Sequence, residues 1–206
     1  MKAAVIGAGG WGTALATVLS GKGYEVHLWV RNSELYKTIL LKRVNETYLP
    51  GVKLPGTIRP TLSLEDTLWG KELIILAVPS QGVRQIAKAI AEYLPYQALI
   101  VNVAKGLEDG TYLRLSQVLQ QELPERHHPN LAILSGPNHA EEVSRGLPSA
   151  TVVASISPKT AKQVQEAMAA PFFRIYTNPD LTGVELGGAF KNVIALGAGI
   201  LDGLEL

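Results

Sequence analysis

The apolar positions of the chain form short runs that alternate with amphipathic stretches. Residues 3–6 are apolar and the run stops at Gly7, and residues 13–19 repeat apolar side chains at helical spacing, so a strand, a glycine turn and a helix are predicted in that order. Residues 26–30 predict a second strand. Ser33 is placed to cap a helix that continues to about residue 44.

The next part of the pattern contains longer aliphatic runs. Residues 45–60 are predicted to be a loop because prolines and glycines recur there. Residues 73–78 are an uninterrupted aliphatic run of the kind found in central parallel strands, and Ser80 follows as a helix cap. Residues 98–103 and 131–134 repeat this pattern of a buried strand.

The order of these elements predicts an α/β fold. Strands and helices alternate from Lys2 to about Leu134, which requires crossover connections and produces a doubly wound, mostly parallel, Rossmann-like sheet. Two further strands, at residues 150–154 and 172–176, are expected to extend the sheet around a helix that starts near Pro158.

The composition changes after Asp180. Residues 186–201 are apolar and small, and Lys191 is their only charge. A helix that is apolar all round is expected to lie in the interior of a protein. We therefore separate residues 1–180, expected to form one domain, from residues 181–206.

Overall composition and charge exclude several classes of protein. Charged residues make up 18% of the 206 positions, below the roughly 25% of ordinary domains, which favours elements buried on both sides. The net charge is +1, so no global field favours nucleic acid or a membrane surface as a partner. The absence of cysteine excludes disulfides and favours a reducing compartment.

An uncharged segment at residues 3–21 follows Lys2 and has the length of a signal peptide or a short membrane span. Five glycines interrupt this segment, at the place where a strand should turn into a helix. We therefore expect a soluble strand-turn-helix unit, no membrane insertion and a cytoplasmic location.

The stretch Gly7-Ala8-Gly9-Gly10-Trp11-Gly12 satisfies the pattern G-x-G-x-x-G between a predicted strand and a predicted helix. Gly7 permits the tight turn, Gly9 lets a pyrophosphate approach the backbone, and Gly12 lets the helix pack against the strand. The helix N-terminus offers free N–H groups and a partial positive charge to phosphates. The alternative is a glycine-rich turn without a ligand.

Arg31 occupies the position, about twenty residues further on, where an acidic residue would accept a hydrogen bond from the ribose 2′-hydroxyl of NAD. A guanidinium cannot accept that bond but can bind a 2′-phosphate, which favours NADP as the preferred cofactor. Glu34 lies near enough to leave NAD possible. Alternatively, Arg31 is a solvated surface charge.

Lys105 and the segment Ser135-Gly136-Pro137-Asn138 each follow a predicted strand. Ligands of open α/β sheets bind at the carboxyl edge of the strands, so both are expected to face the same crevice as the glycine loop. Gly106 indicates a backbone kept clear beside Lys105. Without this context, Lys105 would be an ordinary surface charge.

Lys191 is the most informative single residue. A lysine within an apolar helix must be solvated in a cleft or paired, and a lysine in such a cleft suits a general acid or base. Gly187 and Gly188 remove bulk from the helix surface beneath it. The alternative is a structural lysine whose charged end reaches solvent.

The remaining polar residues suggest no metal site or nucleophile. The four histidines lack metal-ligand spacing, so no metal is predicted. His127 and His128, which precede Pro129, are expected to lie in an exposed loop. The nucleophile pattern Gly-x-Ser-x-Gly is absent from the sequence.

Taken together, six segments resemble the bacterial NAD(P)-dependent glycerol-3-phosphate dehydrogenase family. They are GAGGWGTALA at 7–16, LWVR at 28–31, VPS at 78–80, AKGLE at 104–108, LSGP at 134–137 and GGAFKNVIA at 187–195. The resemblance spans the whole chain and implies reversible reduction of dihydroxyacetone phosphate to sn-glycerol 3-phosphate, a precursor of phospholipids.

The resemblance also implies roles for individual residues. It assigns cofactor contacts to Gly10, Trp11, Arg31, Lys105 and Ala140. It assigns substrate contacts to Lys105, Gly136 and Asn138, and it makes Lys191 the proton donor or acceptor. Many relatives carry Ser or Thr where this chain has Asn138, and an amide can still donate and accept hydrogen bonds.

Members of this family continue beyond the equivalent of Leu206 into a helical domain with an Arg-Asn pair for the substrate phosphate. The resemblance therefore implies that residues 1–180 are a dinucleotide-binding domain and that residues 181–206 begin a helical substrate domain. Two alternatives stay open: a nucleotide-binding fragment without turnover, and a ketopantoate reductase-like dehydrogenase. A homo-oligomer is possible.

Overall fold

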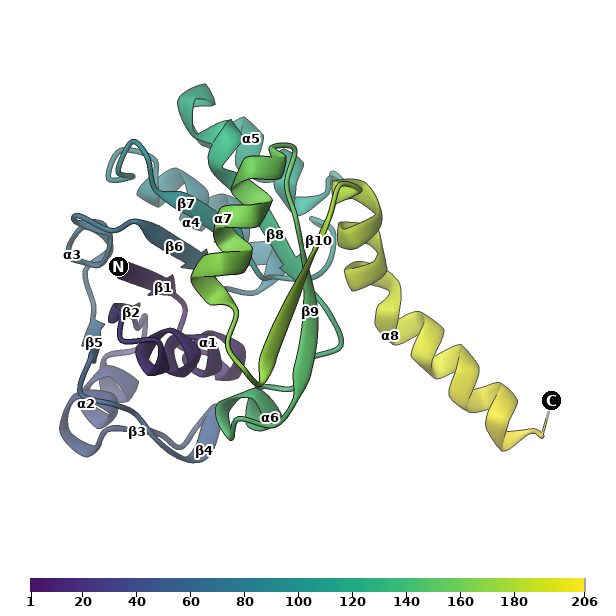
Figure 1. The fold of residues 1–206 in the computed structure, drawn as a ribbon, viewed down its shortest axis with the longest axis horizontal. Helices are drawn as coiled ribbons and strands as arrows, with labels where there is room; N and C mark the ends of the chain where they lie inside the picture. The colour runs from purple at the N-terminus through teal and green to yellow at the C-terminus, as the bar shows by residue number, and fades with distance from the viewer. Residues whose placement is uncertain (206) are drawn as a thin grey trace.

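The computed structural model describes residues 1–205. A central twisted sheet carries helices on both faces, and one long helix projects from the body toward the C-terminus (Figure 1). The eight strands of the sheet, in spatial order, are β10 (Phe173–Asn178), β9 (Ser149–Ala154), β8 (Leu131–Ser135), β7 (Leu99–Asn102), β6 (Leu73–Leu76), β1 (Lys2–Ile6), β2 (Glu25–Trp29) and β5 (Ile58–Thr61).

The helices follow the strands along the chain. They are α1 (Gly10–Gly21), α2 (Ser33–Lys42), α3 (Leu64–Leu68), α4 (Val83–Ile90), α5 (Leu115–Glu122), α6 (Ala140–Ser144), α7 (Pro158–Met168) and α8 (Leu181–Gly203), with short 3-10 helices at Ser80–Gly82 and Glu125–Asn130. Strands β3 (Val44–Asn45) and β4 (Leu49–Lys53) form a separate antiparallel ribbon.

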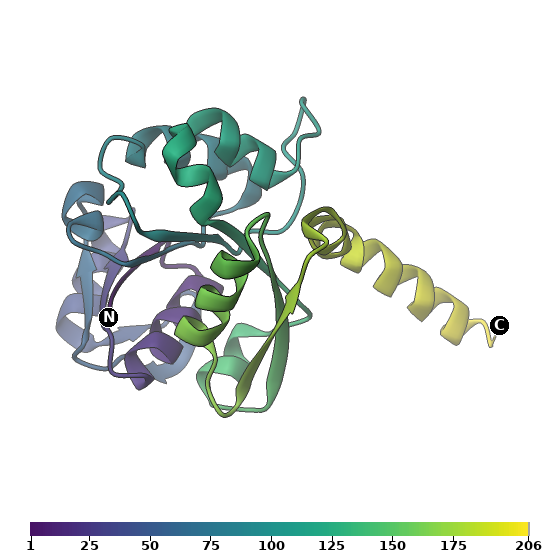
Figure 2. The ribbon, with the colours of Figure 1, turned by 45° about the horizontal axis from the view of Figure 1, so that its top comes forward.

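All neighbouring strands of the large sheet run parallel except β8 and β9, which are antiparallel. The predicted doubly wound, mostly parallel sheet is therefore confirmed. Its two faces are buried by two hydrophobic clusters, and the strands alternate between them: Ala3 and Val5 of β1 belong to one cluster, Ala4 and Ile6 to the other. Helices α1 and α7 cover one face, and α4 and α5 cover the other (Figure 2).

The prediction of a loop at residues 45–60 is wrong. This stretch contains most of the ribbon and the first residues of β5, which pairs with β2 as the outermost strand of the sheet. Pro60 lies within β5 opposite Leu28. A proline lacks the N–H needed in a central strand, but an edge strand tolerates it because one side of the strand has no partner.

Two predicted helix caps are also wrong. Helix α2 is capped by Asn32, whose side chain accepts a hydrogen bond from the Leu35 amide at 2.8 Å, and Ser33 is its first residue. Ser80 begins a 3-10 turn, and its side chain does not cap the helix that follows.

His127 and helix α8 depart from expectation in opposite ways. His127 is fully buried within the 3-10 helix Glu125–Asn130 instead of lying in an exposed loop. Helix α8, expected to be interior, is exposed along most of its length, and Glu185 is its only buried residue within residues 1–205. By length and composition α8 could span a membrane, and 6% of its most apolar window is buried.

Candidate functional site

The candidate site lies where the direction of the sheet's strand order changes. Strand β1 is flanked by β2 on one side and by β6, β7 and β8 on the other. The parallel strands β1, β6, β7 and β8 end at one edge of the sheet, so the loops that follow them meet there. A crevice at this switch point is where open α/β sheets bind their ligands.

Two glycines of the loop after β1 are required by the packing of the protein itself. Gly7 has a φ of +115°, and a Cβ at this position would lie 2.5 Å from the carbonyl oxygen of Ala77. A Cβ on Gly12 would overlap the carbonyl oxygen of Gly7. The contact at Gly12 brings strand β1 and helix α1 together, as the glycine pattern predicts, and the contact at Gly7 adds the end of β6.

Gly9 and Gly10 differ from each other in their surroundings. A Cβ on Gly10 would lie 2.6 Å from the Tyr48 carbonyl oxygen, whereas a Cβ on Gly9 would meet nothing within 4 Å. Gly9 is the N-cap of α1, with no side-chain cap and no acidic residue in the first turn. Free N–H groups beside open space suit a pyrophosphate, so these residues fit a dinucleotide.

Asn45 of the ribbon holds the glycine loop from the side. Its buried amide donates to the Ala8 carbonyl at 2.9 Å and to the Thr13 hydroxyl at 2.8 Å. Its carbonyl accepts from the Tyr48 amide at 3.2 Å. Sequence reasoning missed this residue because it lies in the stretch predicted to be a loop.

Lys105, Trp11 and Gly136 come together across the crevice. The Lys105 Nζ donates to the Gly136 carbonyl oxygen at 2.7 Å and lies 5.9 Å from the centre of the Trp11 ring. Burial of the ammonium, followed by the nearby charge of Lys191, lowers the pKa of Lys105 from its usual 10.5. The chain therefore places a partly desolvated cation at the predicted position.

The loop after Lys105 is fixed by residues that sequence reasoning missed. Arg84 of α4 binds Glu108 with two hydrogen bonds, of 2.6 and 2.8 Å. Gln81 donates to the Leu107 carbonyl at 3.0 Å. The bonds from Arg84 lower the pKa of Glu108 to about 2, so this carboxylate stays charged at neutral pH and the loop keeps its anchor.

Lys191 is exposed and lines a hollow of about 340 Å³ on the β8 side of the crevice. Ser135 and Gly136 line the same hollow, together with Gly187 and Gly188 of α8. The structure therefore brings Lys191 to the segment that also receives the Lys105 hydrogen bond. This side of the crevice is open to solvent within residues 1–205.

Asn138 and Ala140 lie near the same loops. The Asn138 amide donates to the Ala150 carbonyl at 2.8 Å, while its own buried carbonyl oxygen has no hydrogen-bond partner within residues 1–205. Ala140 is the first residue of α6, and its Cβ lies 3.6 Å from the position of a Cβ built on Gly10. Ala140 is thus next to the glycine loop.

Arg31 lies two residues after the end of β2 and is exposed. It makes no side-chain hydrogen bond or ion pair with any residue in 1–205, so its guanidinium is available to a ligand. The neighbouring Glu34 is also exposed and forms an ion pair with Lys37 at 2.9 Å. This surface ion pair leaves most of the Glu34 side chain exposed.

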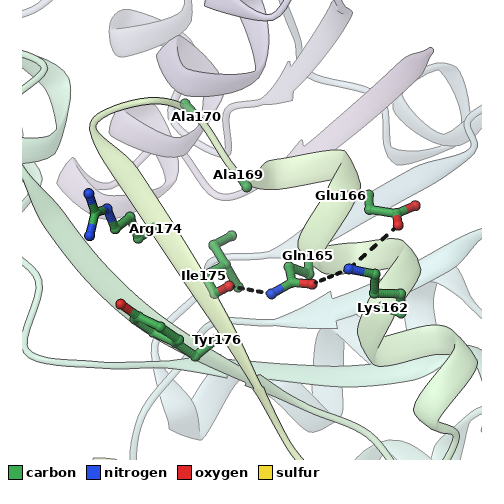
Figure 3. A pocket seen from close by; sticks show the side chains of 8 residues that line it. All are labelled: Lys162, Gln165, Glu166, Ala169, Ala170, Arg174, Ile175 and Tyr176. Atoms are coloured by element: carbon green, nitrogen blue, oxygen red, sulfur yellow. Dashed lines mark hydrogen bonds and ion pairs between the residues drawn. The ribbon is translucent and has the colours of Figure 1, made fainter.

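A second hollow, of about 470 Å³, lies between α7 and β10 (Figure 3). Gln165 connects the two elements there by donating to the Ile175 carbonyl at 2.6 Å. None of the predicted site residues lines this hollow. Within residues 1–205, no group of three or more His, Cys, Asp or Glu side chains is arranged to hold a metal ion.

The sheet order, the switch point and the glycine loop place the chain in the class of Rossmann-like, doubly wound domains. Sequence comparison then gives the family. A model described as the N-terminus of NAD-dependent glycerol-3-phosphate dehydrogenase matches residues 2–161, and a model of the C-terminus matches residues 180–206. The chain belongs to the NAD-dependent glycerol-3-phosphate dehydrogenase family.

Individual relatives agree with this family. The glycerol-3-phosphate dehydrogenase (NAD(P)+) of Moorella thermoacetica is 52% identical over 203 residues, which are 98% of this chain and 59% of the relative. That of Desulfitobacterium hafniense is also 52% identical, over 98% of this chain and 56% of the relative. The chain therefore spans less than two thirds of the length of the curated relatives it matches.

Solved structures show the same fold. The glycerol-3-phosphate dehydrogenase from Coxiella burnetii is 35% identical, with a TM-score of 0.88 over 99% of this chain and 62% of that one. The enzyme from Saccharomyces cerevisiae is 30% identical, with a TM-score of 0.86 over 100% of this chain and 64% of that one. The similarity extends through α8 in both comparisons.

Proposed function

We propose that the chain supplies the cofactor-binding half and the proton-donating lysine of an NAD(P)-dependent oxidoreductase. This enzyme interconverts sn-glycerol 3-phosphate and dihydroxyacetone phosphate and feeds glycerophospholipid synthesis. Residues 1–180 act as the dinucleotide-binding domain, and residues 181–206 begin a helical substrate domain. The names of the relatives support the reaction, and the matches at residues 2–161 and 180–206 support this division.

One observation carries the proposal. Three predicted elements, the glycine loop, Lys105 and Lys191, approach one crevice from β1, β7 and α8. A reaction that transfers a hydride and a proton needs a dinucleotide site beside a proton donor. The crevice combines these requirements at the switch point of the sheet.

When bound, the nicotinamide cofactor supplies the hydride that adds to C2 of dihydroxyacetone phosphate. The chain's own residues then manage charge and protons. Lys105 stabilises the negative charge that develops on the C2 oxygen, and Lys191 donates a proton to that oxygen. In the reverse direction Lys191 accepts the proton of the hydroxyl. Gly136 and Asn138 help to position the substrate.

The preferred cofactor is NADP. An exposed guanidinium without an internal partner at the end of β2 supports this preference, because Arg31 can bind a 2′-phosphate with two parallel hydrogen bonds. The nearby carboxylate of Glu34 is exposed and forms a surface ion pair with Lys37.

A second candidate function is nucleotide binding without turnover. The exposure of Lys191 and of the helix that carries it favours this candidate, because water in an open crevice competes for the developing charge. In either case we place the chain in the cytoplasm. The exposed apolar length of α8 is then a protein-facing surface and does not insert into a membrane.

Calorimetric titration with NADPH and NADH, followed by an activity assay, tests these proposals. We expect NADPH to bind more tightly than NADH, and dihydroxyacetone phosphate to support NADPH oxidation where ketopantoate does not. Binding without oxidation would favour the second candidate. Oxidation with ketopantoate alone would replace the proposed substrate, and binding of neither dinucleotide would reject both functions.

A further inference from the structure

Glu185 is a buried acidic side chain in an otherwise exposed apolar helix. Its side chain is 4% exposed. The carboxylate accepts three hydrogen bonds: from the Arg114 guanidinium at 2.6 Å, the Ser116 amide at 2.8 Å and the Ser116 hydroxyl at 2.6 Å. All three donors belong to the start of α5. The bonds therefore join two elements about seventy residues apart in sequence.

These bonds give the buried carboxylate a cationic partner and two further hydrogen-bond donors. A buried charge is costly unless it is paired and hydrogen-bonded, and Glu185 has both kinds of partner. Arg114 is the N-cap of α5, and Ser116 lies in its first turn. A negative charge at this position is also favoured by the helix dipole of α5.

Gly188 lies one turn further along α8, on the same side as Glu185. A Cβ at this position would overlap the Ser135 hydroxyl and lie 3.7 Å from the Lys105 Cγ. The helix therefore touches the end of β8 and the stem of Lys105 with its bare backbone. Lys191 follows after one more turn and lines the hollow at this contact.

Beyond Lys191, the helix has little to hold it within residues 1–205. Every residue from Phe190 to Glu205 is exposed. The bonds of Glu185 and the close contact at Gly188 are specific interactions that hold the first turns of α8 against the body. A helix held near one end transmits any change of angle to the side chains that follow.

We propose that Glu185 is a positioning residue that docks α8 on the start of α5 and thereby holds Lys191 over the hollow shared with Gly136. The importance of this docking for catalysis rests on the proposed role of Lys191. The docking itself is a property of the chain that can be measured without turnover.

The first test measures the direction of α8. The chain has no cysteine, so Lys162→Cys on α7 and Ile200→Cys on α8 give a unique pair of spin-label sites. We expect a narrow distance distribution in this background and a broad one after Glu185→Gln. Glu142→Gln, which neutralises an exposed glutamate on α6, is the matched control and should leave the distribution narrow.

The second test uses Lys105 as a reporter. Its pKa is lowered by burial and by the charge of Lys191, so undocking of α8 should raise it. NMR titration of 13C-methylated lysines measures this pKa. The variant Lys191→Met removes the neighbouring charge, so it shows how far the loss of that charge alone raises the pKa of Lys105. Loss of the Glu185 charge alone would lower the pKa of Lys105, so an increase in Glu185→Gln identifies undocking.

Further variants keep the proposal falsifiable. Arg114→Lys retains a cation and should preserve most of the docking, while Ser116→Ala removes one donor and gives an intermediate result if Glu185→Gln does not fold. A narrow label distance together with an unchanged pKa of Lys105 in Glu185→Gln would overturn the proposal. Full turnover by Lys191→Ala would instead reject the proposed function and leave the docking intact.

Discussion

The glycine loop and helix α8 contribute the two sides of one crevice, yet they are held in different ways. The loop is enclosed by the Ala77 backbone, the Tyr48 backbone and the Asn45 side chain. Helix α8 touches the body through its first turns and is exposed beyond them. The comparison shows that the glycine-loop side is shaped by dense packing, whereas the side that carries Lys191 depends on fewer contacts.

Replacing Lys191 should give the largest difference between the effects on turnover and on NADPH binding. Lys191→Ala should lower the rate of NADPH oxidation with dihydroxyacetone phosphate by roughly 10²- to 10⁴-fold, the usual contribution of a general acid. The dissociation constant for NADPH should change little, because the glycine loop is untouched. Lys162→Ala, which removes an exposed lysine from α7, is the control. A variant that retains its rate would end the assignment of Lys191.

Two glycine substitutions test whether packing or ligand access dominates within the loop. Gly12→Ala should lower the free energy of unfolding by roughly 1–3 kcal/mol, because the added Cβ meets backbone that cannot move aside. Gly9→Ala should leave stability within about 1 kcal/mol of the wild type, since nothing lies within 4 Å of its Cβ.

NADPH affinity completes this glycine comparison. Gly9→Ala should weaken NADPH binding although it folds normally, because the new methyl group occupies the space left for the phosphates. Chemical denaturation and calorimetry measure the two quantities. Equal stability of the two variants, or unchanged affinity in Gly9→Ala, would contradict the different roles assigned to these glycines.

Substitution of Arg31 tests the proposed preference for NADPH over NADH. A bidentate contact between arginine and phosphate contributes about 1.5–3 kcal/mol, so NADPH should bind roughly ten- to hundredfold more tightly than NADH. Arg31→Asp should reverse this order, because a carboxylate repels the 2′-phosphate and accepts from a 2′-hydroxyl. Arg59→Asp, a change at another exposed arginine, should not. Equal affinities in wild type and variant would make Arg31 a solvated charge.

His127 gives the smallest expected effect and probes the body away from the crevice. It is fully buried, neither ring nitrogen has a partner within residues 1–205, and burial followed by the charges of Arg126 and His128 lowers its pKa below 6.5. The unfolded chain therefore binds the proton more readily. This contribution to stability is complete above pH 6.5 and is lost as the pH falls through the folded-state value.

Unfolding measured from pH 8 to pH 5 should show this loss, with a slope of at most about 1.4 kcal/mol per pH unit from one proton. His127→Leu should flatten the slope, whereas His139→Gln, at an exposed histidine, should leave it unchanged. The same slope in wild type and His127→Leu would show that other groups cause the loss of stability at low pH.

The sheet could be predicted from sequence where burial on both faces leaves an uninterrupted apolar run. Residues 73–76 of β6 are such a run, and β7 carries one at residues 99–101 before it ends at Asn102; both strands were predicted to within two residues at each end. Strand β5 could not be recognised, because an edge strand accepts Pro60 and needs one buried face only. His127 was missed because Pro129 suggested a loop, although a 3-10 turn tolerates proline near its end.

The candidate site was predicted in part. Gly7 and Gly12 belong to a local motif, so the turn at Gly7 and the close packing at Gly12 could be predicted, whereas the contact of Gly7 with the Ala77 backbone could not. The role of Glu185 was not predicted, because the apolar stretch 186–201 begins one residue after it. Its partners Arg114 and Ser116 are about seventy residues away, and no local pattern reports a contact over that separation. A lone acidic residue beside an apolar helical stretch is the signal that could have revealed it.

The hydrogen bonds of Asn45 also bear on the order in which the chain acquires its structure. The glycine motif occupies six consecutive residues, but the side chain that donates to its Ala8 carbonyl lies 37 residues further on. During synthesis the glycine motif emerges long before Asn45, whose side-chain amide holds it. The chain between Ala8 and Asn45 must therefore close into a loop before the glycine motif reaches its final conformation. A nascent chain that ends before Asn45 contains every glycine of the motif and still lacks the completed loop.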